Sequence, residues 1–212
     1  MKNGLYARFY ETLARPLRRR SRVLLLLLVI PLALSFTAPL WRISMTAPQY
    51  PDGLVLDIYA YTVEGDIQEV KTLNHYIGMA AIDRASLTDL DWIPFAVGVL
   101  VLLVLRVAAI GTVRWLIDAA VLFVYFSLFS FGRFAYMLYT FGHNLDPKAP
   151  FSLEPFTPAI IGTKEIANFT TTSLPATATF YLAIFALGIF AVAAWEVRSG
   201  LRTEEEPPAL QP

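Results

Sequence analysis

The 212-residue chain contains no cysteine. This absence excludes disulfides, thiolate metal ligands, iron–sulfur clusters and a thiol nucleophile. Charge is scarce as well, because charged residues make up 16% of the chain, whereas a typical soluble domain has about 25%. The composition therefore argues against a soluble domain.

Recognised catalytic and nucleic-acid signatures are missing too. The chain has no G-x-S-x-G, H-E-x-x-H or P-loop motif, so we do not expect an enzyme. The formal net charge is zero and no nucleic-acid-binding motif is present, so we expect no nucleic-acid partner.

Long apolar runs are what the chain has instead, and 56% of its residues are hydrophobic. About 20 consecutive apolar residues are enough for a helix to cross a bilayer. Four runs meet this length and predict transmembrane helices at residues 23–41, 93–112, 115–139 and 178–197. The first run is too long for the apolar part of a typical cleaved signal peptide, so we expect it to be an uncleaved anchor.

The arginines give the expected orientation. Five of them lie in Arg15–Arg22, directly before the first apolar run, and basic residues favour the cytoplasmic side. With four spans, residues 1–22 and the tail 198–212 both lie in the cytoplasm. Residues 42–92 and 140–177 then face the outside, and membrane lipid surrounds the helices.

The two outer segments carry different local patterns. In Leu54–Tyr61 apolar and polar residues alternate, which is typical of a half-buried strand, and a second short strand is expected at Ile67–Val70 after a turn at Glu64–Asp66. The segment 140–177 contains five prolines and is expected to form an ordered Pro-rich loop. The predicted fold class is an all-α transmembrane protein with four helices and a small extracytoplasmic cap of a β-hairpin and this loop.

Two strings in the outer segments resemble a family of small bacterial four-helix membrane proteins. They are "APQYPDGLVLDIY" continuing to "LNHYIGM", and "GHNLDPKAPFSLEPF" continuing to "IANF". The resemblance covers about a third of the chain. It implies a place in the bacterial inner membrane beside maturation systems of copper enzymes of the nitrous oxide reductase type. The partners that it implies are membrane or periplasmic proteins of a copper-maturation or respiratory complex.

Apart from the initiator, all methionines and histidines of the chain fall on the expected outer side. Imidazole and thioether without thiolate suit copper better than structural zinc. If "NHYIGM" is helical, the spacing i, i+4 puts the first histidine and the following methionine on one face. The candidate copper ligands are therefore His75, Met79 and His143, with Met45, Met137 and Asp146 in support. The alternative is that both histidines hold the loops together without metal.

Two of the charges inside the predicted membrane helices lie on either side of the same turn. Arg106 and Asp118 stand six residues before and six residues after Thr112, so they lie at the same depth, about 9 Å from the turn. An unpaired charge in hydrocarbon is costly, so we expect a structural ion pair. A proton or ion relay is the alternative.

Two functions follow from these observations. The first is a membrane accessory protein that helps to deliver copper to, or to assemble, an extracytoplasmic respiratory copper enzyme. The alternative is a non-catalytic structural subunit of a larger respiratory or transport complex, with the cap as its docking surface.

Overall fold

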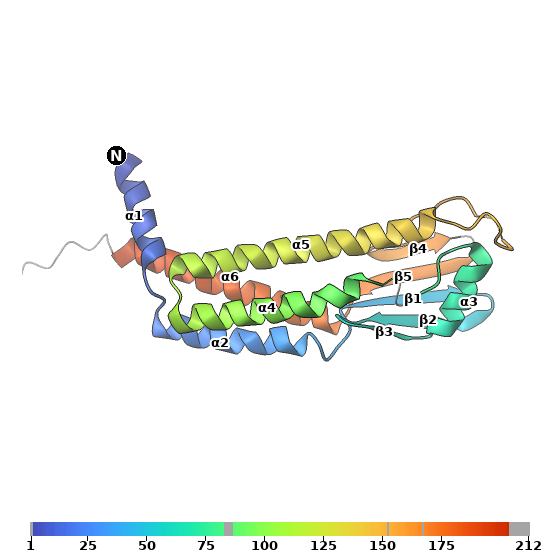
Figure 1. Cartoon of the computed structure of the whole chain (residues 1–212), viewed down its shortest axis with the longest axis horizontal. Helices are drawn as coiled ribbons and strands as arrows, with labels where there is room; N and C mark the ends of the chain where they lie inside the picture. Colours follow the sequence, from blue (N-terminus) through green and yellow to red (C-terminus); the bar gives the residue numbers. More distant parts are fainter. Residues whose placement is uncertain (1, 83–86, 152, 167, 204–212) are drawn as a thin grey trace, which may run out of the picture. The chain divides into compact units, whose positions relative to one another are not determined.

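The computed structural model describes residues 2–82, 87–151, 153–166 and 168–203. Within these residues the chain forms six helices and five strands (Figure 1). The helices are α1 Lys2–Ala14, α2 Arg19–Leu34, α3 Ile67–Ile77, α4 Asp89–Ile110, α5 Val113–His143 and α6 Thr177–Thr203. The strands are β1 Trp41–Ala47, β2 Tyr50–Ile58, β3 Val63–Gly65, β4 Gly162–Ile166 and β5 Phe169–Pro175.

The chain divides into two compact units, and the helices α2, α4, α5 and α6 contribute to both. Unit 1, the helical unit, consists of Met1–Ala33, Gly98–Tyr125 and Leu182–Pro212. Unit 2, the sheet unit, consists of Leu34–Val97 and Phe126–Tyr181.

Three helices in the described part of the chain are long and apolar enough to cross a membrane. They are Leu90–Ile110, Val113–His143 and Thr177–Leu201. The structure thereby confirms that the apolar runs predicted at 93–112, 115–139 and 178–197 form helices of spanning length, and it supports an association with a membrane.

The predicted all-α four-helix fold class is wrong, and the helix expected over residues 23–41 is shorter than its apolar run. Helix α2 ends at Leu34. Its apolar part then measures about 18 Å at about 1.5 Å per residue, short of a hydrocarbon core of about 30 Å. The Thr37 amide closes a turn on the Leu34 carbonyl at 3.0 Å, and the Leu40 amide donates to Ile58 at 2.7 Å. These bonds lead the chain into the sheet, where Trp41 begins β1.

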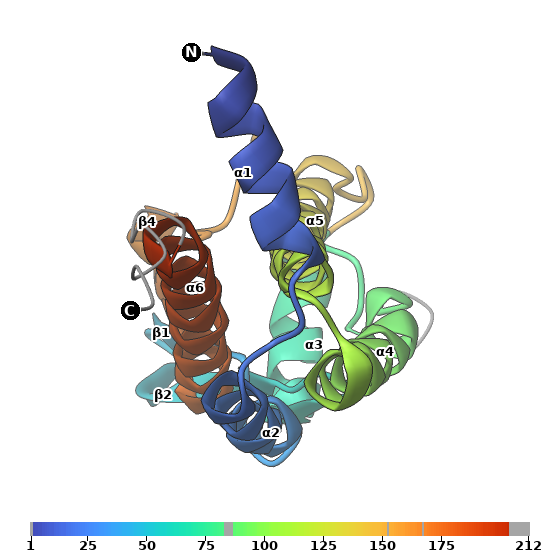
Figure 2. The same cartoon turned by 90° about the vertical axis from the view of Figure 1, so that its left-hand side faces the viewer.

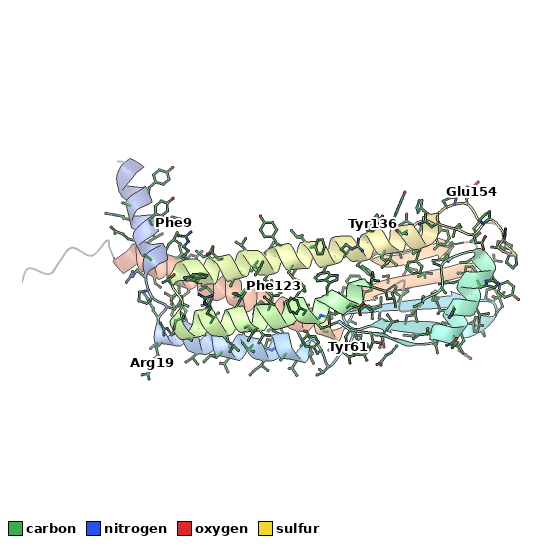
Figure 3. All side chains as sticks on the ribbon, viewed as in Figure 1. Phe9, Arg19, Tyr61, Phe123, Tyr136 and Glu154 are labelled. Atoms are coloured by element: carbon green, nitrogen blue, oxygen red, sulfur yellow. The ribbon has the colours of Figure 1, made fainter. Side chains whose placement is uncertain are left out.

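In unit 1, α2 lies beside α6 (Figures 1 and 2). Helix α1 stands at a steep angle to the long helices, at their left-hand end in Figure 1. Gly188 of α6 permits the close approach, because a Cβ there would lie 2.3 Å from the Leu28 side chain. Phe123 of α5 and Phe185 of α6 meet edge to face with ring centroids 4.9 Å apart, and Phe123 is labelled in Figure 3. Both rings are buried, so they form a central part of the core of this unit.

In unit 2, all strand pairs are antiparallel and the strand order is β3-β2-β1-β5-β4. This is a correction to the predicted hairpin and loop. Strand β2 confirms the alternating segment from Leu54 to Ile58, whereas Ile67–Val70 begins α3 and is not a strand. The turn predicted at Glu64–Asp66 overlaps the strand β3. Strands β4 and β5 lie in the segment predicted as a Pro-rich loop. They form because β5 pairs with the distant β1, where Ile43 stands opposite Ser173.

Helix α3 covers one face of the sheet. Its buried residues are Val70, Leu73, Asn74 and Ile77, the spacing of an amphipathic helix. Val70 forms a buried cluster with Leu54 and Leu56 of β2, against which Met45 packs. The opposite face of the sheet is polar and includes Arg42, which donates two hydrogen bonds of 2.7 Å to Asp57.

Candidate functional site

The predicted copper ligands lie around the end of helix α3. The helix ends at Ile77, and Gly78 caps it in the left-handed conformation with φ +76°. The Met79 amide donates to the Asn74 carbonyl at 2.9 Å and completes the cap. Met79 therefore lies beyond the helix, so it does not share a helical face with His75 as the spacing i, i+4 had suggested.

Backbone hydrogen bonds join this helix end to the loop that follows α5. The Asp146 amide donates to the Gly78 carbonyl at 2.8 Å, and the Phe151 amide donates to the Tyr76 carbonyl at 3.0 Å. We call these paired segments, residues 76–79 and 146–151, the α3–loop junction. The junction brings together the two strings that carry the histidines of the chain.

Close packing at Gly78 means that the junction requires glycine at this position. A Cβ on Gly78 would lie 2.9 Å from the Asp146 carbonyl oxygen and 3.0 Å from the Ala149 Cβ. Its positive φ also disfavours any other residue. The glycine of "IGM" and the aspartate of "LDP" thus have a structural role in the fold.

His143 is the last residue of α5, and its ring is held in one orientation. Nδ1 lies 2.9 Å from the Tyr139 carbonyl oxygen. A carbonyl oxygen only accepts, so Nδ1 carries a proton, and in the neutral ring the lone pair is then on Nε2. The ring also stacks on Tyr139 with centroids 3.8 Å apart. Metal-binding histidines commonly have this arrangement, in which the second ring nitrogen donates to a carbonyl.

The other candidate ligands have varied surroundings. His75 is exposed on α3, whereas Met79 and Met137 are half-buried. Met45 packs into the cluster beneath α3, as methionine often does to fill a gap. The Asp146 carboxylate accepts a 2.8 Å hydrogen bond from the Lys148 amide. Among the described residues, no three His, Asp or Glu side chains gather into a metal site.

Arg106 and Asp118 line one cavity of about 240 Å³ on the α4–α5 hairpin. The ion pairs within 4.0 Å among the described residues are Arg18–Glu196 and Arg42–Asp57. The predicted Arg106–Asp118 pair is thus not closed in this structure. The Arg106 guanidinium lies over the Trp115 ring instead, 4.9 Å from its centroid.

Sequence reasoning missed the buried carboxylate of Glu196. This residue of α6 is 5% exposed and accepts hydrogen bonds from the Ser21 hydroxyl and, at 3.1 Å, from the Arg18 amide. The Arg18 guanidinium stands 3.9 Å away. The carboxylate thus caps the start of α2, where a negative charge is favourable. A lone acidic residue inside the last apolar run was the available signal.

The Arg42–Asp57 pair belongs to the polar face of the sheet. Its two hydrogen bonds, and the charge of Asp57, raise the pKa of Arg42. Both side chains are partly exposed, so the pair contributes little to stability.

In comparisons with known proteins, no family model, no curated protein and no solved structure matches the chain.

Proposed function

We propose that the protein is a membrane-anchored accessory protein that binds copper transiently and passes it to an extracytoplasmic respiratory enzyme. The observation that carries this proposal is the α3–loop junction, which joins the two histidine-bearing strings through the Asp146–Gly78 and Phe151–Tyr76 hydrogen bonds. Both strings also carry the resemblance to small bacterial membrane proteins, and that resemblance implies a place beside copper-enzyme maturation systems.

The side chains that would hold copper are His75, Met79 and His143. Imidazole nitrogen and thioether sulfur are ligands that copper accepts in both of its common oxidation states. His143 fits this role because Nδ1 donates to Tyr139 and leaves Nε2 available. His75 fits because its ring is exposed on α3.

The proposed location is the bacterial inner membrane, with the arginine-rich end of unit 1 in the cytoplasm. The Leu17 amide donates to Gly111, the Val113 amide donates to Arg15, and the Arg15 side chain donates to Gly200. The α1–α2 connection, the α4–α5 turn and the end of α6 therefore lie together. Arginines gather there, at positions 8, 15, 18, 19, 20, 22, 114 and 198, and favour the cytoplasmic side.

A copper titration tests the proposal. The full-length protein in detergent should bind Cu(I) with about one-to-one stoichiometry, as measured by competition with a chromogenic chelator. His75→Ala and His143→Ala should each weaken binding by about tenfold or more, whereas Met79→Leu should cost less because the thioether is a weaker ligand. Lys71→Ala, one turn before His75 on the same helix, is the matched control and should bind normally.

Two results would contradict copper handling. One is a wild-type protein that binds no Cu(I) at micromolar concentrations. The other is a set of histidine variants that lower the melting temperature with or without copper, which would give the histidines a structural role only.

The second candidate is a non-catalytic docking subunit of a larger membrane complex. The polar face of the sheet favours it, because the Arg42–Asp57 pair and the Thr163–Thr172 hydroxyl contact of 2.9 Å are exposed. Blue-native electrophoresis of host membranes tests it. The wild-type chain should migrate in a complex, and Thr172→Arg, which adds bulk and charge to this face, should release it as a smaller species.

A further inference from the structure

We propose that the groove on the α4–α5 hairpin is the interface for a second copy of this chain, closed by reciprocal Arg106–Asp118 ion pairs. The proposal stands apart from copper binding, because every residue in it belongs to unit 1 and none to the α3–loop junction.

The groove is apolar except for one charge of each sign. Its volume is about 240 Å³, and its walls include Leu103, Val107, Gly111 and Ala119. Large apolar side chains at its rim are exposed: Ile110 by 73%, Trp115 by 47% and Leu122 by 42%. Both α4 and α5 are long and apolar enough to span a membrane, so this surface faces lipid in a single copy.

The two charges form no ion pair with each other within 4.0 Å in the described part of one copy. Neither Arg106 nor Asp118 is in an ion pair among the described residues, whose pairs are Arg18–Glu196 and Arg42–Asp57. The Arg106 guanidinium lies over the face of the Trp115 ring, 4.9 Å from its centroid. Charged side chains on membrane helices are costly in contact with lipid, and in known proteins they pair or face a protein interior.

The positions of the charges suit a two-fold axis parallel to the helices. Arg106 precedes Thr112 by six residues and Asp118 follows it by six, so both lie about 9 Å from the turn. A two-fold interface brings residue i of one copy to residue j of the other, and j to i. Equal depth allows both Arg106–Asp118 pairs to form at once.

A second copy is a better partner for the groove than an anionic lipid is. An anionic headgroup would neutralise Arg106 but would leave Asp118 beside it without a counter-charge. The groove carries one positive and one negative group, so it is complementary to itself. Burying the exposed rim of Ile110, Trp115 and Leu122 adds an apolar contribution in the same contact.

Charge reversal in two differently tagged full-length chains tests the proposal. Arg106→Asp gives a groove with two acids, and Asp118→Arg gives a groove with two bases. In vesicles of phosphatidylcholine, wild-type chains should form dimers, as counted by single-molecule photobleaching. Each variant alone should dissociate about 30-fold more readily or worse, and the two variants mixed should form heterodimers. Arg198→Asp, a reversal outside the groove, should dimerise as the wild type does.

Cysteine cross-linking keeps the test valid if a reversed charge prevents folding. The chain has no cysteine, so Ile110→Cys creates one thiol at the rim of the groove with both charges intact. Oxidation should give a covalent dimer. Val23→Cys on α2 is the matched control, since it is 52% exposed near the same end of unit 1, and it should remain monomeric.

Four results would overturn the proposal. The first is a wild-type chain that is monomeric at every protein-to-lipid ratio. The second is a mixture of the two reversed variants that associates no better than either variant alone. The third is equal cross-linking of the Ile110→Cys and Val23→Cys chains. The fourth is a chain that stays monomeric in vesicles containing phosphatidylglycerol and binds that lipid through Arg106. Arg106 would then be a lipid-binding residue and the dimer would be wrong.

Discussion

Replacing Glu196 by leucine should destabilise the helical unit by about 2–6 kcal/mol, from two donors at about 1–3 kcal/mol each. The change leaves two donors in a poorly hydrated place without an acceptor: the Ser21 hydroxyl, whose residue is 0% exposed, and the Arg18 amide. A buried donor that loses its partner costs about 1–3 kcal/mol. The ion pair adds little to this sum, because the Arg18 side chain is 43% exposed and 3.9 Å away.

Glu196→Gln is the matched control, because an amide oxygen can still accept from Ser21 and Arg18. It should cost about 1 kcal/mol, the difference between a charged and a neutral acceptor. Ser21→Ala combined with Glu196→Leu should cost less than the sum of the two single changes, since the double variant leaves no hydroxyl unpaired.

The free energy of unfolding is measured by titrating SDS into the protein in mixed micelles, with tryptophan fluorescence as the signal. If Glu196→Leu is as stable as the wild type, the carboxylate does not hold α2 to α6. If the glutamine variant is as unstable as the leucine variant, the negative charge of Glu196 stabilises the unit, and the loss of a hydrogen-bond acceptor does not explain the effect.

The remaining predictions concern the sheet unit and the orientation of the chain. Gly78→Ala should lower the melting temperature more than Gly162→Ala, because both have a positive φ but only Gly78 has a neighbour within 3 Å of the added Cβ; equal losses would contradict close packing at the junction. Trp41→Phe should cost about 1–3 kcal/mol in unfolding experiments, because the indole N–H donates to the buried Ser173 hydroxyl at 2.7 Å. Cysteines introduced at Lys164 and Arg114, both exposed, should react with an impermeant thiol reagent from opposite sides of the membrane, and labelling of both from one side would refute the proposed orientation.

Local composition was enough to locate the three long helices. Their apolar runs are about as long as a bilayer is thick, and each helix satisfies its own backbone hydrogen bonds, so no distant segment has to be known. The alternation in β2 was also visible locally, because one face of that strand meets the core and the other does not. The strings around His75 and His143 were recognisable, but their pairing through Gly78 and Asp146 was not.

Only the tertiary structure decided where α2 ends and what the Pro-rich segment becomes. The run at 23–41 is apolar throughout, but Trp41 pairs with Ile58 on one side and Pro175 on the other, so its last residue belongs to the sheet. Strand β5 forms because it pairs with β1 from the other end of the chain, and a local window cannot contain both partners. Side-chain partners also depended on the tertiary structure. Glu196 accepts a hydrogen bond from Ser21 of a distant helix. Arg106 and Asp118, which the sequence spacing predicts to pair, form no ion pair within 4.0 Å in one copy. The sequence determined which segments are apolar enough for a membrane, because that depends on neighbours along the chain. Packing determined pairing, because it depends on neighbours in space.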